Sequence, residues 1–508
     1  MQLTENAKKV LQQRIYRPGE NYHKLCQRVA SAISPSTSDY QVNYQLMHEQ
    51  VFLPNSPCLM GAGTDLQQLF ACFVLPVEDS MESILDTFKD MCMIHKSGGG
   101  TGFNFSKLRP SNAKVRSTNG VASGPISFMK MYNAGAEQIK QGGRRRGANM
   151  GILNINHPDI LRFITAKTCE GDLANFNLSV GVTNMLFNSA VTHLIDPSTG
   201  SPIDQLQSEE LLDKIAHAAW ANGEPGVLFL DTINRNSPHP DKRMDTTNPC
   251  GEYPALPYEP CVLGSINLNN VLHPNDDLSF QKLADVTRAA VKFLDSCIEA
   301  STYPLDIIEQ MAKHRRKIGL GVMGLADVLI RYGLPYDSQE GRLFAKKIIH
   351  TIQTTAHHES AGRNTTCTAI APTGTLSLIA NCSSGIEPLF ALQYERRVLN
   401  GYKLREYPPA IAESLQYFGA KAIVDLPKHA QEIFKTSGEI APEDHVRMQA
   451  AIQQHVDNGV SKTVNLPNSA TVADVKNVIK LAHALDCKGI TVYRDGSRDE
   501  QVYCPICD

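Results

Sequence analysis

The chain has 508 residues, of which 42% are hydrophobic and 20% charged, and its formal net charge is -3. These values describe a globular protein large enough for two to four domains or one oversized barrel. They exclude a mini-protein, and without a basic excess we expect no nucleic-acid partner. The first residues lack an apolar leader and no stretch approaches the roughly 20 apolar residues that span a bilayer, so we expect a cytoplasmic protein without a membrane partner. Thirteen scattered cysteines favour reduced thiols over a secreted disulfide framework.

The order of apolar patterns along the chain predicts a mostly parallel α/β fold. Residues 1–50 have helical periodicity. Beyond residue 51, short apolar runs alternate with longer helix-like segments, as in α/β proteins. The strand-like runs include CFVLPV, GILNI, GVLFL, RKIGLGVMGLADVLI and TCTAIAP. The last residues are polar and carry a CxxC pair, so we expect a mobile tail.

Three glycine-rich segments are candidates for anion binding. HKSGGGTGFNFSK (95–107) resembles a phosphate cradle, although it lacks the GK[ST] ending of a P-loop and the GxGxxG of a dinucleotide fold. QGGRRRGANMG (141–151) suits a loop that meets an anion, and a solvated basic turn is the alternative. APTGTLS (371–377) precedes a helix-like segment, where its amides and hydroxyls suit a phosphate or only an N-cap.

The loop NPCGEYPALPYEPC (248–261) concentrates chemically active side chains. Asn248, Cys250 and Glu252 alternate, so in an extended backbone they leave on one face and can converge on a small substrate. Four prolines forbid a helix and stiffen the loop. The pattern indicates an active site, and a buried structural pair of cysteines is the alternative.

Motifs along nearly the whole chain resemble those of the catalytic subunit of ribonucleotide reductases. In chain order they are FLPNSPCLMGAG, LFACFVLPVEDSM, HKSGGGTGFNFSKLRP, QGGRRRGANMGIL, NPCGE, APTGTLSLIANCSSGIEP and CKGITVYRDGSR. The SSGIEP and GITVYRDGSR segments are most similar to the adenosylcobalamin-dependent class II enzymes. The resemblance implies reduction of ribonucleotides to 2′-deoxyribonucleotides by thiyl-radical chemistry, with adenosylcobalamin as cofactor and allosteric control of specificity by deoxynucleoside triphosphates.

The same resemblance implies the organisation of the domains. Residues 51–495 would form a ten-stranded α/β barrel with an effector-binding segment at 79–150 and a central finger loop at about 245–265. Residues 1–50 would form an N-terminal helical region without the ATP-binding cone of many relatives, and residues 496–508 a flexible redox tail.

The resemblance also implies the catalytic roles. Cys250 matches the position of the thiyl radical, Glu252 the carboxylate that takes the 3′-hydroxyl proton, and Asn248 an amide that orients the same region. Cys72 and Cys261 would supply two reducing equivalents and end the cycle as a disulfide.

The terminal Cys504 and Cys507 would carry electrons from thioredoxin or a glutaredoxin-like reductant to that disulfide. The alternative is half of a zinc ribbon, since CxxC is also a metal-ligand pair. We favour the redox role and predict no metal site.

Substrate and effector positions are implied by short motifs. The ribonucleotide would contact Ser56, Ala71, Gly251, Pro372, Thr373, Gly374, Thr375, Leu376 and Ser377. A deoxynucleoside triphosphate at a homodimer interface would contact Asp79, Lys96, Arg109, Arg116, Lys140, Gln141 and Arg145. Residues 116–123 would lie beside the effector base, and residues 140–145 would link effector to substrate by adopting one conformation for each effector.

Absent motifs separate the subclasses. Class I enzymes receive the radical through a tyrosine pair, whereas this chain has Tyr493 alone. Class III enzymes carry a glycyl-radical motif and lack the glutamate, whereas Gly496 stands in an unrelated context and Glu252 is present. No DxHxxG motif occurs, so the cofactor prediction rests on the resemblance. The alternatives are a class I-type large subunit that needs a separate radical-generating subunit, and an inactive nucleotide-binding paralogue.

Overall fold

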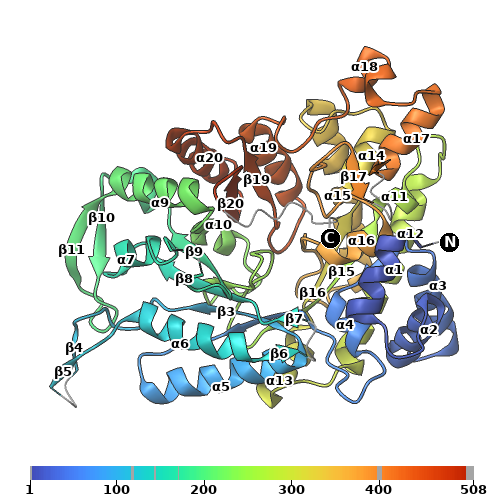
Figure 1. Ribbon diagram of the computed structural model, residues 1–508. Helices are drawn as coiled ribbons and strands as arrows, with labels where there is room; N and C mark the ends of the chain where they lie inside the picture. The colour runs from blue at the N-terminus through green and yellow to red at the C-terminus, as the bar shows by residue number, and fades with distance from the viewer. Residues whose placement is uncertain (1–2, 116–118, 142–144, 170, 398–402, 499–508) are drawn as a thin grey trace.

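A helical region precedes the barrel. The computed structural model describes residues 3–115, 119–141, 145–169, 171–397 and 403–498. The helical region consists of α1 (Glu5–Val10), the π-helix η1 (Leu11–Ile15), α2 (Tyr22–Ile33) and α3 (Thr37–His48), at the right of Figure 1. The side chains of Thr4, Asn21 and Ser36 cap α1, α2 and α3 by accepting a hydrogen bond from the amide three residues on. These caps explain why each helix begins where it does.

Ten strands form the central sheet, in two sets that run in opposite directions. The first set is β2 (Cys72–Leu75), β3 (Gly100–Asn104), β8 (Asn149–Asn154), β9 (Phe176–Val182) and β12 (Gly226–Phe229). The second set is β15 (Pro260–Asn267), β16 (Ile318–Met323), β19 (Thr463–Leu466) and β20 (Gly489–Arg494), and β1 (Phe52–Pro54) pairs with β15. Neighbouring strands within each set are parallel, except that β1 is antiparallel to β15. The two sets meet in two antiparallel pairs, β2 with β15 and β12 with β20. The prediction of a ten-stranded α/β fold with an N-terminal helical region is therefore confirmed.

Two isolated bridges close the sheet into a barrel. Leu320 of β16 bridges to Thr368, and Ile370 bridges to Val460, just before β19. The apolar run at 366–372 therefore lies in the wall as predicted, but it contributes only single bridges rather than a regular strand.

Helices cover the outside of the barrel (Figure 1). The longer ones are α5 (Met81–Ser97), α6 (Pro125–Gln138), α9 (Ser208–Asn222), α12 (Ser279–Ala300), α13 (Asp306–Arg315), α15 (Gln339–Ser360), α17 (Pro409–Phe418), α19 (Pro442–Gln453) and α20 (Val472–Ala484). The short ones are α4 (Ser56–Gly61), α7 (Ile160–Ile164), α8 (Met185–Asn188), α10 (Leu230–Arg235), α11 (Leu268–Val271), α14 (Leu325–Arg331), α16 (Gly374–Ala380), α18 (Lys428–Gln431) and the 3-10 helix η2 (Ile423–Asp425). Among the described residues, no helix combines the length and apolar character needed to cross a bilayer.

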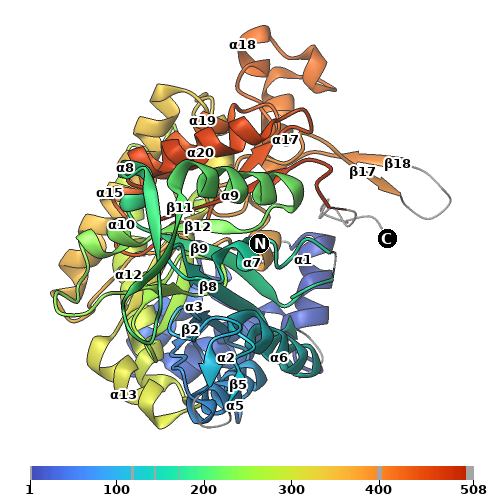
Figure 2. The same cartoon turned by 90° about the vertical axis from the view of Figure 1, so that its left-hand side faces the viewer.

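Within the described ranges, five two-stranded hairpins lie outside the main sheet. They are β4 (Lys114–Val115) with β5 (Gly120–Val121), β6 (Lys140–Gln141) with β7 (Arg145–Arg146), β10 (Val191–Ile195) with β11 (Pro202–Gln207), β13 (Thr246–Thr247) with β14 (Pro254–Ala255), and β17 (Tyr394–Arg397) with β18 (Lys403–Glu406). Figure 2 shows the β17–β18 hairpin projecting away from the barrel. The β13–β14 hairpin is the one that matters for the site.

The segment at 95–107 is not a phosphate cradle. Gly98 has φ +96° and caps the C-terminal end of α5, and the chain then enters β3. A helix C-terminus carries partial negative charge and presents carbonyl groups, so it disfavours an anion. The glycines of this segment form the turn after α5 and allow β3 to pass close to Pro249 and Thr247 of the β13–β14 hairpin.

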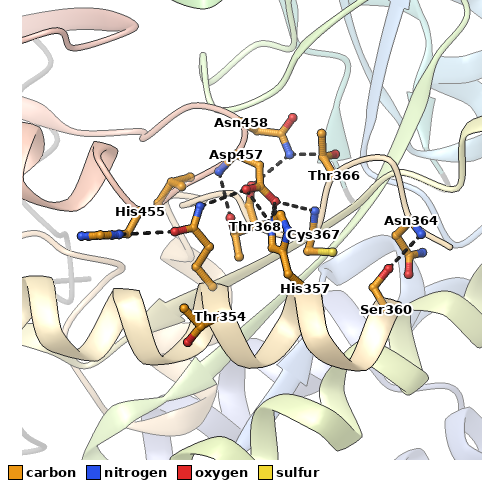
Figure 3. A network of polar contacts seen from close by, with 12 residues as sticks. Thr354, His357, Ser360, Asn364, Thr366, Cys367, Thr368, His455, Asp457 and Asn458 are labelled. Atoms are coloured by element: carbon orange, nitrogen blue, oxygen red, sulfur yellow. Dashed lines mark hydrogen bonds and ion pairs between the residues drawn. The ribbon is translucent and has the colours of Figure 1, made fainter. Parts of the chain in front are cut away.

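A half-buried carboxylate, that of Asp457, holds the closing segments of the barrel together (Figure 3). Asp457 Oδ2 accepts hydrogen bonds from the backbone amides of Cys367 and Thr368, at 2.8 and 3.1 Å. Asp457 Oδ1 accepts one from Gln353 of α15 at 3.1 Å, and His357 Nε2 of the same helix lies 2.9 Å from both oxygens. The carboxylate thus ties α15 to both sides of the closure.

The stability of the barrel closure should depend on pH through His357 and Asp457. The hydrogen bond to Asp457 raises the pKa of His357. Burial alone would raise the pKa of Asp457, but the hydrogen bonds from His357 and the Cys367 amide outweigh it and lower that pKa. The contribution of His357 to the folding stability is complete below the pKa of histidine in the unfolded chain, about 6.5. It is lost as the pH rises through the raised pKa of the folded state. The contribution of Asp457 to the folding stability is complete above about pH 4, the pKa of aspartate in the unfolded chain. It is lost as the pH falls through the lowered pKa of the folded state.

We expect His357→Gln to lower the melting temperature by about 1–2 °C between roughly pH 4 and 6.5 and by less at pH 8 or above. A thermal-shift series over pH measures the difference from the parent chain. His358→Gln, an exposed histidine next along α15, is the control. A difference that stays constant from pH 5 to 9 would contradict this account.

Candidate active site

The β13–β14 hairpin carries residues 248–253 across the interior of the barrel. A side chain at Gly102 of β3 would overlap the carbonyl oxygen of Thr247, and a Cβ at Gly459 would lie 2.6 Å from the carbonyl oxygen of Gly251. The amide of Gly459 donates to Glu252 O at 2.7 Å. Since β3 and Gly459 belong to opposite halves of the wall, the hairpin touches both sides, and only glycine permits these approaches.

The tip of this finger loop is a turn, not an extended strand. Gly251 has φ +80° and its amide donates to Asn248 O at 3.1 Å. Asn248 and Glu252 are buried, whereas Cys250 is exposed. The prediction that alternation in an extended backbone puts the three side chains on one face is therefore wrong, because the glycine reverses the chain between them.

Asn248 and Glu252 nevertheless converge, and they do so on Cys72. Asn248 Nδ2 lies 3.0 Å from Cys72 Sγ, and Cys72 Sγ lies 3.9 Å from Glu252 Oε1. The amide of Tyr253 donates to Asn248 Oδ1 at 3.0 Å. That bond fixes the side-chain amide with its NH₂ group toward the thiol.

Cys261 lies directly opposite Cys72 on the neighbouring strand. The two residues are register partners in the antiparallel pairing of β15 with β2, and both are buried free cysteines. Opposite residues in such a pair have Cα atoms roughly 4.5–5.5 Å apart, which is within the range for a disulfide. The strand pairing thus allows the two thiols to form a bond without a change of fold.

The environment keeps the Cys72 thiol protonated. Burial raises its pKa well above the usual value, and the nearby Glu252, Cys261 and Cys250 raise it further, against the hydrogen bond from Asn248. Cys72 is therefore a hydrogen donor at neutral pH rather than a thiolate.

Sequence reasoning missed a buried ion pair behind these thiols. Lys317 Nζ lies 2.5 Å from Glu259 Oε2, and His239 Nε2 lies 3.1 Å from Glu259 Oε1, all with almost no exposure. Burial would raise the pKa of Glu259, but His239 and Lys317 outweigh it and hold the pKa at about 2. The available signal was a charged residue just before each of two apolar strands: Glu259 precedes β15 and Lys317 precedes β16.

The segment at 371–377 lies against the same thiols. Ala371 and Ala71 pack on the apolar cluster that contains Cys72 and Cys261. Thr373 has φ +52° and its hydroxyl accepts from the Gly385 amide at 2.7 Å, which fixes the loop just before α16. The remaining predicted substrate residues of this loop are Gly374, Thr375, Leu376 and Ser377, in the first turns of α16. Ser56 begins α4, after β1.

The predicted effector residues do not form one compact group within the chain. Arg109 Nε lies 2.7 Å from Asp79 Oδ2, just before α5. Lys96 lies near the other end of α5, and a helix of this length spans roughly 25 Å. Lys140, Gln141 and Arg145 lie in the β6–β7 hairpin, of which only the backbone is described, and Arg116, Cys504 and Cys507 fall outside the described residues.

One group away from the finger loop has metal-ligand residue types. The donor atoms of His357, Cys367 and Asp457 lie within 4.8 Å of one another. Both oxygens of Asp457 already accept hydrogen bonds, and burial, with Asp457, raises the pKa of the Cys367 thiol to about 12. A protonated thiol is a poor metal ligand, so we interpret this group as the structural clamp described above.

The structure belongs to the class of α/β barrels built from two antiparallel halves, here with an amide and a carboxylate of a central finger loop against buried thiols. The family model "Ribonucleotide reductase, barrel domain" matches residues 70–362 and 361–493, and "Ribonucleotide reductase, all-alpha domain" matches residues 1–67. The chain belongs to the ribonucleotide reductase family.

Curated relatives narrow the subclass. A vitamin B12-dependent ribonucleoside-diphosphate reductase of Thermoplasma acidophilum is 45% identical over 501 residues, which cover 90% of this chain and 65% of that protein. A protein of the same description from Mycobacterium tuberculosis is 42% identical over 537 residues, covering 96% of this chain and 78% of that protein. The chain thus spans slightly less than two thirds of the first relative and more of the second.

A solved structure supports the fold. The class Id ribonucleotide reductase alpha subunit of Actinobacillus ureae matches with a TM-score of 0.82 at 23% identity, over 97% of each chain. At this identity the likeness concerns the architecture.

The close approaches of the finger loop can be tested directly. Gly459→Ala would push a methyl group against Gly251 O and displace the loop tip, at a cost of about 1–3 kcal/mol. We expect a fall of several degrees in melting temperature. Gly438→Ala is the matched control, because that glycine is exposed and an added Cβ meets nothing within 4 Å. Equal melting temperatures for the two variants would rule out the tight passage of the loop.

Proposed function

We propose that the chain reduces ribonucleotides to 2′-deoxyribonucleotides with a radical carried on Cys250. The observation that carries this proposal is the convergence of Asn248 and Glu252 on Cys72, with Cys261 opposite. Loss of a 2′-hydroxyl needs a hydrogen-atom acceptor, a base and two electrons, and a thiyl, a carboxylate and a dithiol supply them. The names of the relatives support this reaction and a ribonucleoside diphosphate as substrate.

Burial and protonation support a division of roles among these residues. The Cys250 thiyl takes the 3′-hydrogen of the ribose while Glu252 accepts the 3′-hydroxyl proton. Cys72, held protonated, donates a proton to the departing 2′-hydroxyl. Cys72 and Cys261 then supply two electrons and become a disulfide, and the 3′-hydrogen returns from Cys250 to the product. Asn248 orients the Cys72 thiol for this work.

Adenosylcobalamin fits the exposure pattern of the site. Of Cys72, Cys250 and Cys261, only Cys250 is exposed, so it is the thiol that a bulky cofactor can reach. When bound, the cofactor supplies the radical that Cys250 carries. The vitamin B12-dependent relatives support this choice.

The 372–377 loop would hold the substrate phosphates. Its contact with the thiol cluster through Ala371 sets it beside the site, and the first amides of α16 lack partners within the helix, as at every helix N-terminus. Ser56, Ala71 and Gly251 would line the nucleoside side of the same space.

A homodimer would complete the effector site. Because α5 separates Asp79 and Arg109 from Lys96, a deoxynucleoside triphosphate could contact both ends only if a second copy brings its own α5 alongside. Met81, Leu85 and Met93 are exposed on one face of α5 at spacings of four and eight residues, which suits such an interface. Arg116, Lys140, Gln141 and Arg145 would then read the effector base.

The tail would connect the site to a cellular reductant. A disulfide between two buried cysteines is out of reach of a folded protein such as thioredoxin, so Cys504 and Cys507 would exchange with it first. Such dithiol chemistry suits the cytoplasm, where thiols are kept reduced.

The radical assignment predicts the behaviour of Cys250→Ser. With adenosylcobalamin, a ribonucleoside diphosphate and dithiothreitol, reduction should fall at least about a hundredfold, because a serine hydroxyl cannot carry the radical. Nucleotide binding by equilibrium dialysis should stay within about twofold.

Cys169→Ser, at another exposed cysteine, is the control and should keep full activity. Turnover by Cys250→Ser would refute the assignment. Turnover by the parent chain without adenosylcobalamin, after addition of a separate radical-generating subunit, would instead favour the class I-type alternative.

The tail is tested by replacing both of its cysteines with serine. We expect thioredoxin-driven turnover to stop after about one product per chain, while dithiothreitol, which is small enough to enter the barrel, restores steady turnover. Zinc content is measured on the same preparation. Full thioredoxin-driven turnover, or stoichiometric zinc that the double variant loses, would contradict the redox role.

A further inference from the structure

The buried pair of Lys317 and Glu259 has no part in the chemistry proposed so far. Burying an ion pair is costly unless each charge is well satisfied, so its position calls for an explanation. Lys317 Nζ and Glu259 Oε2 are 2.5 Å apart and both side chains are buried to at least 99%. Arg315 Nε lies 3.8 Å from Glu259 Oε1, on the same carboxylate as His239.

The strand register places Lys317 next to Cys261. In the parallel pairing of β15 with β16, Val262 faces Ile318, so the preceding residues, Cys261 and Lys317, are neighbours. Lys317 Nζ also lies 5.6 Å from the ring centroid of Tyr253, which packs in one cluster with both thiols. Because β15 separates β16 from β2, the cation is closer to Cys261 than to Cys72.

The two sulfur atoms also differ in access. Cys261 is fully buried, and a Cβ at Gly319 would lie only 3.2 Å from its Sγ, so strand backbone covers that side. Cys72 Sγ faces Asn248 and Glu252 at the finger loop, toward the exposed Cys250. A thiol entering the site therefore meets Cys72 first.

We propose that Lys317 makes Cys261 the leaving sulfur when the oxidised site is reduced. An incoming thiolate attacks Cys72 Sγ, a new S–S bond forms there, and the Cys72–Cys261 bond breaks. Its electron pair goes to Cys261 Sγ, which leaves as a thiolate beside the ammonium and then takes a proton. A second thiol of the same dithiol reductant releases Cys72. This inference rests on the proposed function, which makes these two cysteines the redox pair.

Electrostatics favour this direction. Burial raises the pKa of Cys261, and Lys317 opposes that rise more strongly than either Glu252 or Glu259 alone adds to it. Burial and Glu252 both raise the pKa of Cys72, with only the Asn248 hydrogen bond opposing them. A cation thus offsets negative charge on Cys261, whereas none does so on Cys72, and a disulfide breaks faster toward the sulfur that forms the more stable thiolate.

The test maps the first adduct of a small thiol. Full-length chain carrying Cys504→Ser and Cys507→Ser, so that the tail does not compete, is oxidised by one turnover without reductant. It is then exposed briefly to 2-mercaptoethanol and trapped with N-ethylmaleimide. Peptide mass spectrometry should find mercaptoethanol on Cys72 and maleimide on Cys261, with about tenfold or greater preference over the reverse.

Lys317→Met alone would take from the buried Glu259 carboxylate its contact at Oε2 and threatens folding, so the main variant is Lys317→Met with Glu259→Gln, which removes both charges together. In this double variant we expect the ratio of mercaptoethanol adducts on Cys72 to those on Cys261 to fall about tenfold, while the melting profile stays unchanged. The matched control is Lys462→Met with Glu387→Gln, an ion pair of a buried lysine and a half-buried glutamate with the same 2.5 Å separation, which has no register contact with either thiol. It should keep the parent preference.

Adducts on Cys261, an even distribution in the parent chain, or an unchanged preference in the Lys317 and Glu259 double variant would overturn the inference. Those results leave the redox pair itself intact. If turnover yields no Cys72–Cys261 disulfide at all, the proposed function fails at this step and the inference fails with it.

Discussion

The antiparallel pairing of β2 with β15 is the constraint on which the site depends. It joins the two parallel halves of the barrel at one seam and sets Cys72 opposite Cys261. The same β15 pairs on its other edge with β16, which brings Lys317 beside Cys261. One strand therefore fixes the separation of the two thiols, the charge next to one of them and the junction of the wall.

In the proposed reaction, the thiols differ in role as they differ in burial. Cys72 and Cys261 lie inside the barrel, where desolvation keeps them protonated and able to give hydrogen and electrons. Cys250 is exposed at the turn made by Gly251. Close approaches at Gly102 and Gly459 hold the loop between the halves, and the clamp at Asp457 closes the wall behind it. The contacts at Gly102, Gly459 and Asp457 thus stabilise the barrel and also hold the finger loop in position beside the thiols.

The sequence predicted the fold class and named the residues around the finger loop, because motifs preserve residue types in order. The sequence did not predict the backbone conformation that brings Asn248 and Glu252 together, because a turn with a positive φ at Gly251 replaces the expected extended backbone. Glu259 and Lys317 are 58 residues apart, one in the 248–261 loop and the other at the start of the run RKIGLGVMGLADVLI, so only the β15–β16 register reveals them as a pair. The glycines at 95–107 read as an anion cradle by composition, yet their place after a helix C-terminus decides otherwise.

The most direct test of the account is a disulfide map after a single turnover. The fully reduced chain receives adenosylcobalamin and a ribonucleoside diphosphate without any external reductant, and the products are quenched with N-ethylmaleimide and digested. The chain used carries serine in place of both tail cysteines. The account predicts a disulfide-linked peptide pair joined through Cys72 and Cys261, in an amount proportional to the deoxyribonucleotide formed. Deoxyribonucleotide formed while both of these cysteines remain labelled with maleimide would contradict it.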